Sequence, residues 1–255
     1  MKFGLKLGSN AIAYFNAAQA LRDKGCFDYI ELFIVPGSDV SLAQKWKSLN
    51  VPFIFHAPHS LAGMNLSLKE NETHNRKCIS EVAVWARALQ PRWIIYHAGL
   101  NGTLNETIRQ FAIFKQAMPD AFRNALIENK PKVGINGECC LGVEPAELSS
   151  IMTSLGFGFC LDFGHALCAA YSLNENEKTF LDKLFALNPK VHHLSDGKKH
   201  TQVDSHAHLG KGELDLPWLL SLVPAGGWLT LETNKNYPDK LDDFAEDIRY
   251  AQEAA

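Results

Sequence analysis

Nine side chains of the kinds that bind metal ions stand at or just beyond the ends of short apolar runs. They are His56, His97, Glu128, Asp162, His165, His193, Asp204, His206 and Glu232. The runs include VPFIFHA, RWIIYHA and WLTLET, each of which has the pattern of a buried strand. Imidazole nitrogens and carboxylate oxygens are ligands of Zn, Mn and Fe(II), and they can converge from distant parts of a chain. The sequence therefore predicts a metal-dependent active site.

The apolar runs must be positioned by a fold that brings their ends together. They recur at intervals of roughly thirty residues and alternate with amphipathic segments. The expected strands are FGLKLG, DYIELFIV, a third that begins at Pro52 and ends in FHAPHS, RWIIYHAGL, NALIENK, GFCLDF, VHHLSD and the segment 228–233. The expected helices are 10–24, 42–49, 68–89, 104–117 with an alternative continuation past Pro119, 144–155, 175–187 and 241–251. This alternation predicts an α/β fold, a (β/α)8 TIM barrel in which residues 1–255 form a single domain.

Such a barrel explains why polar residues close the apolar strands. The carboxyl ends of its strands meet at one face, where enzymes with this fold carry their active sites. We therefore expect the nine side chains to point toward one shared site. The segment 197–215 is rich in Gly, His and Lys and too long for an idle connection, so we expect an active-site loop there.

Composition limits the classes of partner only weakly. The chain has 255 residues, 46% of them hydrophobic, a formal net charge of −3 and a pI near 6.4. It offers no basic field for nucleic acid, but bound metal ions can supply positive charge locally, so nucleic acid is neither indicated nor excluded. The six cysteines form no CxxC pair and no run is long enough to span a membrane. We expect a cytoplasmic protein without a membrane partner; the oligomeric state is left open.

Taken singly, most of these side chains have an ordinary structural explanation. A lone strand histidine is usually hydrogen-bonded in the core, Asp162 with His165 could form a helix-capping turn, and a polar loop is usually solvated. Glu128 and Glu232 are more informative, because a carboxylate inside an apolar strand is costly to bury unless it is paired or metal-bound. Convergence of all nine on successive strand ends favours a metal site.

Two neighbouring histidines, His192 and His193, lie on one expected strand. Successive strand side chains point to opposite faces, so only one of them enters the barrel.

The polar motifs resemble those of the xylose isomerase-like barrels, and within them the endonuclease IV type of apurinic/apyrimidinic endonuclease. The motifs that carry the resemblance are HAG at His97, Glu128-Asn129, Asp162-x-x-His165, HLSD at His193, DSHAHLGKG from Asp204, and Glu232-Thr233. Together with His56 they cover most of the chain. The family match also selects His193, rather than His192, as the ligand.

The resemblance implies a polynuclear site with two or three divalent ions, zinc first, with Mn or Fe as alternatives. His56, His97 and Glu128 would hold one metal. A second would lie among Glu128, Asp162, His193 and Glu232, and a third among His165, Asp204 and His206. The implied activity is hydrolysis of a phosphoester, abasic DNA among the candidates, by a metal-bridging hydroxide beside Glu128. Bridging metals suit this reaction because they make a nucleophile from water near neutral pH.

Several alternatives stay open. The loops FIVPGSD and PHSLAGM lack the Arg and aromatic wedges that endonuclease IV enzymes insert into duplex DNA. Glu31 in DYIELF is similar to the sugar isomerase side of the superfamily. A sugar or sugar phosphate isomerase or epimerase would need a single divalent metal, with Glu128 and Glu232 as acid/base groups. The third class is a barrel that binds without catalysis.

The remaining candidates are supporting residues. Lys211, between two glycines, could contact an anionic substrate, whether a small phosphorylated compound, a sugar phosphate or DNA. Asn129, Asp196 and Thr233 each stand close to an expected ligand and could orient it by hydrogen bonding.

Overall fold

Eight parallel strands close into a barrel in which each strand pairs with its neighbours in chain order. The structure is a computed structural model, and it describes residues 1–254. The strands are β1 (Lys2–Gly8), β2 (Tyr29–Phe33), β3 (Phe53–His56), β4 (Ile94–Tyr96), β5 (Ala125–Glu128), β6 (Gly158–Asp162), β7 (Val191–Leu194) and β8 (Trp228–Leu231). This confirms the predicted TIM barrel.

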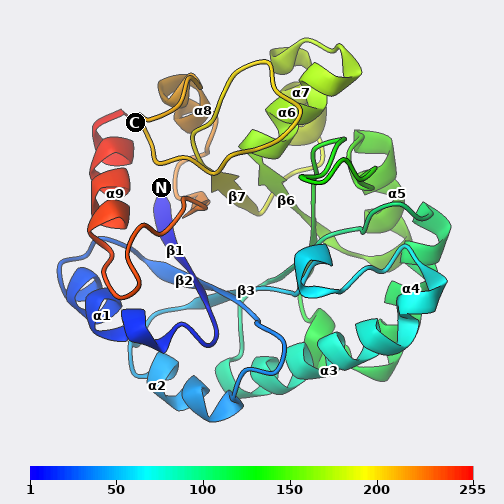
Figure 1. The fold of residues 1–255 in the computed structure, drawn as a ribbon, viewed down its shortest axis with the longest axis horizontal. Helices are drawn as coiled ribbons and strands as arrows, with labels where there is room; N and C mark the ends of the chain where they lie inside the picture. Colours follow the sequence, from blue (N-terminus) through cyan, green and yellow to red (C-terminus); the bar gives the residue numbers. More distant parts are fainter. Residues whose placement is uncertain (255) are drawn as a thin grey trace.

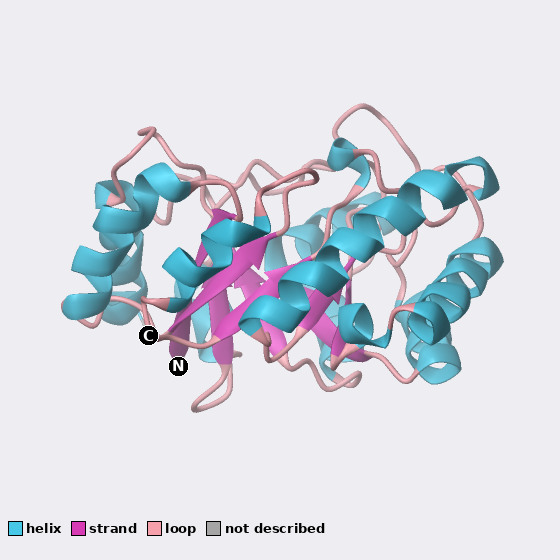
Figure 2. Cartoon of the chain, turned by 90° about the horizontal axis from the view of Figure 1, so that it is seen from below, coloured by secondary structure: helices cyan, strands magenta, loops and turns pink. Residues whose placement is uncertain are grey.

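Helices form a ring outside the strands (Figure 1). They are α1 (Phe15–Asp23), α2 (Ala43–Lys47), α3 (Glu72–Leu89), α4 (Leu104–Ala117), α5 (Pro145–Leu155), α6 (Phe163–Leu173), α7 (Glu177–Phe185), α8 (Leu216–Ser221) and α9 (Asp242–Ala254). The view from the side shows the strands inside, with helices and connecting loops around them (Figure 2). Within residues 1–254, no helix combines the length and apolar character that a membrane crossing requires.

Three details differ from the sequence prediction. Helix α6 directly follows β6 and was not expected, because FGHALCAAYSL is apolar on nearly all sides and has no amphipathic period. The short helix α8 was also missed. Helix α4 ends at Ala117 and does not continue past Pro119, because Met118 has φ −137° and ψ 64°, in keeping with the bias against helical geometry before proline.

A small apolar layer closes the amino end of the barrel. Its buried members are Tyr29, Ile54, Ile95, Leu126, Cys160 and Val191, with Trp93 and Trp228 packed against them. Gly4 makes room for this layer, because a Cβ there would overlap the ring of Tyr29. The larger core lies between strands and helices.

The side chain two residues beyond an inward-facing one lies on the same face of its strand. Two residues beyond Ile54, Leu126, Cys160 and Val191 stand His56, Glu128, Asp162 and His193. The alternation that buries the apolar layer therefore sets a polar layer directly above it, toward the carboxyl end.

Candidate metal centre

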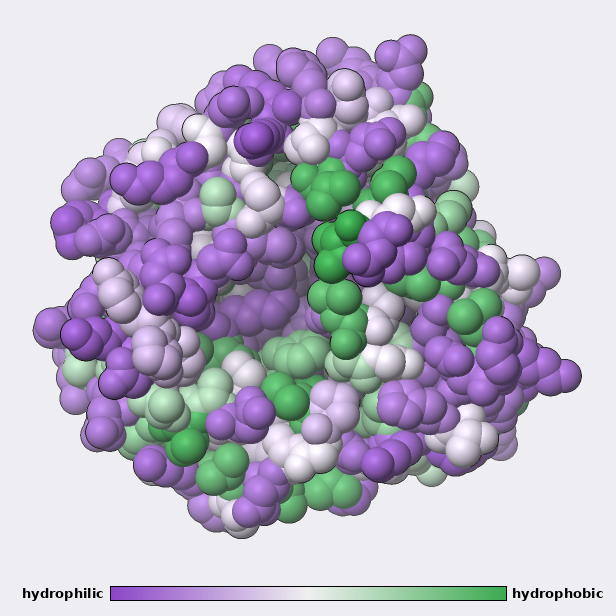
Figure 3. All heavy atoms as spheres, viewed as in Figure 1, coloured by the Kyte–Doolittle hydropathy of each residue, from purple (hydrophilic) through white to green (hydrophobic). Residues whose placement is uncertain are grey.

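The polar layer forms the floor of a cavity of about 290 Å³ at the carboxyl end of the strands. In the space-filling view the cavity is the hollow near the centre of the molecule (Figure 3). Seven of the nine predicted ligands line it: His56, His97, Glu128, His165, Asp204, His206 and Glu232. The other two, Asp162 and His193, are buried beside Glu128.

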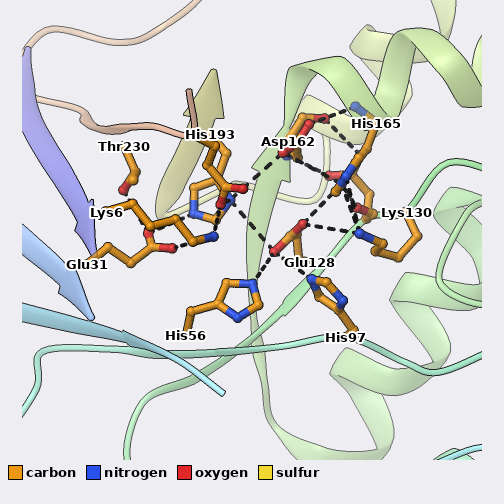
Figure 4. Close-up of polar contacts among 12 residues, drawn as sticks. Lys6, Glu31, His56, His97, Glu128, Lys130, Asp162, His165, His193 and Thr230 are labelled. Carbon is orange, nitrogen blue, oxygen red and sulfur yellow. Dashed lines mark hydrogen bonds and ion pairs between the residues drawn. The ribbon is translucent and has the colours of Figure 1, made fainter. Parts of the chain in front are cut away.

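Glu128 lies at the centre of the cluster (Figure 4). Its Oε2 is 3.1 Å from His56 Nε2 and 3.2 Å from His97 Nε2, and its Oε1 is 3.0 Å from His165 Nδ1. Burial acts to raise the pKa of Glu128, but the imidazoles of His97, His165 and His56 outweigh it and hold the pKa well below its usual range. Glu128 is therefore an anion surrounded by imidazoles from three other elements.

The spacing Asp162-x-x-His165 follows from helix capping. Asp162 ends β6 and is the N-cap of α6, where its Oδ1 accepts the backbone N–H of His165 at 2.7 Å. Asn129 supports both residues: it exchanges hydrogen bonds with the backbone of Asp162, and its carbonyl lies 3.0 Å from His165 Nδ1. The cap thus turns both side chains into the site.

A second group combines His165 of α6 with Asp204 and His206 from the loop after β7. The ligand atoms of His165, Asp204 and His206 lie within 4.8 Å of one another. Asp196 shapes this loop by accepting backbone N–H groups from residues 197, 212 and 214. Gly164 lies directly against Asp204, since a Cβ on this glycine would be 2.5 Å from Asp204 Oδ2.

On the opposite side, a buried ion-pair network joins β1, β2, β7 and β8 (Figure 4). Glu31 accepts from His193 Nε2 at 2.8 Å and from Thr230 Oγ1 at 2.7 Å, and its Oε1 lies 3.1 Å from Lys6 Nζ. Lys6 also contacts Glu232, whose Oε1 lies 2.6 Å from His193 Nδ1. Burial opposes ionisation of Glu31, but His193 and Lys6 lower its pKa to about 2.

The hydrogen bonds of the histidines fit metal binding. His56, His165 and His206 each place Nδ1 against a main-chain carbonyl, of Ala57, Asn129 and Glu232 respectively, at 2.8, 3.0 and 2.9 Å. A donating Nδ1 leaves the Nε2 lone pair for a ligand. In His165 that lone pair faces the ammonium of Lys130, which a bound metal ion would have to displace. His193 is anchored the other way, through Nε2, and presents Nδ1.

Two buried atoms among residues 1–254 support the same conclusion. His193 Nδ1 and Asp204 Oδ2 have no hydrogen-bond partner. An unprotonated Nδ1 beside a carboxylate oxygen of Glu232 is repulsive unless a cation or a proton lies between them. The donor set and its orientation therefore fit divalent metal ions.

Sequence reasoning missed several charged or polar side chains of the cavity, namely Lys6, His59, Ser60, Lys130 and Glu138. Lys6 and Lys130 both line it, and Lys130 Nζ donates to His165 Nε2 at 3.2 Å. His59 also lines it, stacked on His97 at 5.1 Å, and burial followed by repulsion from His56 lowers the pKa of His59 to about 3. Lys211, the lysine singled out from the sequence, is exposed and does not line the cavity.

The structure also places the other residues discussed from the sequence, namely Thr233, His192, Asn129 and Asp196. Thr233 donates its hydroxyl to Asp247 at 2.6 Å rather than to a predicted ligand. His192 points away from the site and packs between Phe163 and Phe185. Asn129 contacts the backbone of Asp162 and the ring of His165, and Asp196 binds backbone N–H groups of the loop after β7.

The sequence of this chain is similar to those of known proteins. The sequence model of the family described as "Xylose isomerase-like TIM barrel" matches residues 18–254. A "Probable endonuclease 4" of Mycobacterium tuberculosis is 24% identical over 192 residues, which cover 72% of this chain and 73% of that protein. A protein of the same name from Thermoplasma volcanium is 25% identical over 166 residues, covering 61% and 58%.

Solved structures share the fold. Endonuclease IV from Thermus thermophilus superposes with a TM-score of 0.77 at 20% identity over 100% of both chains. A D-tagatose 3-epimerase-like protein gives a TM-score of 0.70 at 20% identity over 99% of both chains. Nucleases and sugar-modifying enzymes therefore share this barrel, and the side chains of the site must distinguish between the two chemistries.

Proposed function

The chain belongs to the xylose isomerase-like TIM barrel family, and from that premise we propose that it is a metal-dependent phosphoesterase. The observation that carries the proposal is the group formed by His165, Asp204 and His206. A single-metal isomerase of this family has no need of it, because Glu128, Asp162, His193 and Glu232 would suffice. Relatives named endonuclease 4 support the proposal.

His56, His97 and Glu128 would hold one ion, and His165, Asp204 and His206 another. Glu128, Asp162, His193 and Glu232 are proposed to hold a further one. Divalent ions bound there would supply Lewis acidity and an activated water near neutral pH. The nine ligand roles and the count of two or three ions are part of the proposal.

The chain's own residues would bind and orient the phosphate. Lys130 and Lys6 place ammonium groups at the floor of the cavity, where they attract an anion. Asn129 and Glu31 hold His165 and His193 in fixed orientations. In the net reaction, water oxygen forms a bond to phosphorus, the bond to the ester oxygen breaks, and a water proton ends on the departing oxygen.

Metal content together with phosphodiester hydrolysis tests the proposal. Protein purified without a tag should carry two or three metals per chain by mass spectrometry of the elements and should hydrolyse bis(p-nitrophenyl) phosphate. Asp204→Asn should lose one metal and at least about 100-fold in rate, because a ligand to a charge-stabilising ion is gone. His200→Gln is the matched control, since His200 is an exposed histidine of the same loop.

A sugar isomerase or epimerase is the second candidate. It is favoured by two carboxylates, Glu128 and Glu232, that line one cavity of about 290 Å³, a volume suited to a small ligand. One metal per chain, unaffected by Asp204→Asn, would contradict the phosphoesterase proposal and support this one. Turnover would then be sought among monosaccharides and their phosphates.

A further inference from the structure

The mouth of the cavity is apolar, unlike its floor. Leu61, Ile135 and Val203 line the cavity with exposed fractions of 68%, 61% and 36%. They come from three separate loops, after β3, β5 and β7. In Figure 3 hydrophobic side chains form a band along one side of the central hollow. We call these three residues the apolar rim.

Single exposed hydrophobic residues are ordinary, but a cluster around a cavity is not. Six large hydrophobic residues are exposed in the part of the chain that the structure describes, and three of them form this rim. Partly buried Val133 and buried Met64 continue the apolar lining inward. Leaving this surface in water is unfavourable, so a ligand with an apolar portion would gain free energy by covering it.

Charge at the same place disfavours a polynucleotide. Among residues 1–254, Lys6 and Lys130 are the only lysines or arginines that line the cavity, and both belong to its floor. Glu138 adds a negative charge to the lining. The flanking phosphates of a nucleic acid would need cations at the mouth, because phosphate contacts supply most of the affinity for nucleic acid.

We propose that the substrate is a small phosphoester whose phosphate lies on the floor and whose esterified group is apolar and packs against Leu61, Ile135 and Val203. This inference rests on the proposed phosphoesterase function. It narrows the substrate class to compounds that combine one phosphate with an alkyl or aryl group.

Binding of phosphonates tests the inference without turnover, because the carbon–phosphorus bond resists hydrolysis. Titration calorimetry of the metal-loaded protein would compare methylphosphonate with phenylphosphonate. The phenyl compound should bind about tenfold more tightly, since part of its ring area leaves water. Its binding should also show the more negative heat-capacity change.

The triple variant Leu61→Ser, Ile135→Ser, Val203→Ser should abolish the preference and leave the affinity for methylphosphonate unchanged. Val84→Ser is the matched control, because Val84 is an exposed valine on helix α3, away from the cavity lining. The variant residues are exposed, so folding should be preserved.

Each outcome decides a separate question. Equal affinity for the two phosphonates, or a preference that survives the triple variant, overturns the apolar rim but leaves the phosphoesterase proposal standing. If a labelled abasic duplex binds more tightly than phenylphosphonate, with an affinity that the triple variant does not change, that result would overturn the proposed role of the apolar rim and favour DNA as the substrate. Failure of every phosphonate to bind, with no hydrolysis of bis(p-nitrophenyl) phosphate, overturns the proposed function itself.

Discussion

Glu31 does not line the cavity, yet it touches Lys6, which does, and His193, a predicted ligand. Its carboxylate is fully buried, accepts hydrogen bonds from His193 and Thr230, and neutralises the ammonium of Lys6. A buried carboxylate in such a network keeps its partners fixed, and removing its charge leaves them uncompensated. We regard Glu31 as a positioning residue for His193.

Glu31→Gln should therefore weaken both folding and metal binding. The neutral amide removes one of the two carboxylates that balance the Lys6 ammonium and weakens the contact with His193, so the free energy of unfolding should fall by about 2 kcal/mol. His193 should lose its fixed orientation, so metal content should also fall. Urea unfolding and elemental analysis of the same sample measure the two effects. Glu70→Gln, which alters an exposed glutamate, is the control. Unchanged metal content in Glu31→Gln would show that His193 does not depend on this contact.

At the scale of elements, the first turn of α6 couples the helix to the loop after β7. Gly164 is the second residue of α6, and its lack of a side chain lets Asp204 approach the helix. Helix formation alone would favour alanine at this position by about 0.5–1 kcal/mol. The glycine therefore serves the contact with Asp204, not the helix.

Gly164→Ala should leave the protein folded but displace the Asp204 carboxylate, because the new methyl group would lie 2.5 Å from its Oδ2. We expect the loss of one metal per chain, as in Asp204→Asn, at an unchanged or higher unfolding temperature. Elemental analysis with thermal unfolding checks both parts. Full metal content in Gly164→Ala would mean that Asp204 can move without loss of its role.

The elements that the sequence predicted well are those with a clear period. Strands and amphipathic helices such as α3 were found, whereas α6 was not, because its residues 163–170 are all buried and so show no polar face. Within the strands, the ligands were recognised because each ends an apolar run. Lys6 and Glu31 lie in mid-strand, where the observed register pairs them with each other and pairs Glu31 with the inward-facing Ile54. Glu31 was noted in the sequence for its likeness to the sugar isomerases, but its contacts with His193 and Lys6 were not predicted, and Lys6 was missed.

At the scale of the whole molecule, the barrel separates two populations of histidine. The five histidines predicted as ligands face carboxylates. His192 instead lies outside the strands among aromatic rings, with Nδ1 3.2 Å from the carbonyl of Trp228. Burial lowers the pKa of His192 to about 4, and the carbonyl only partly opposes this shift. The packing of helices on the barrel thus keeps the His192 imidazole neutral, and the free energy of unfolding should therefore depend on pH.

The sign of that dependence follows from proton binding. The unfolded chain binds a proton at His192 near pH 6.5, whereas the folded chain binds it only near pH 4. The folded state is therefore fully stable with respect to this group above pH 6.5, and it loses stability as the pH falls toward 4. Between pH 7 and pH 5 the wild type should lose about 2 kcal/mol more of its free energy of unfolding than His192→Gln does. Glutamine keeps an N–H donor but does not titrate. Urea unfolding at several pH values measures the difference, and His200→Gln corrects for the loss of a histidine as such. Parallel curves for the wild type and His192→Gln would contradict the prediction, because they would mean that His192 is protonated without opening the packing between the barrel and its helices.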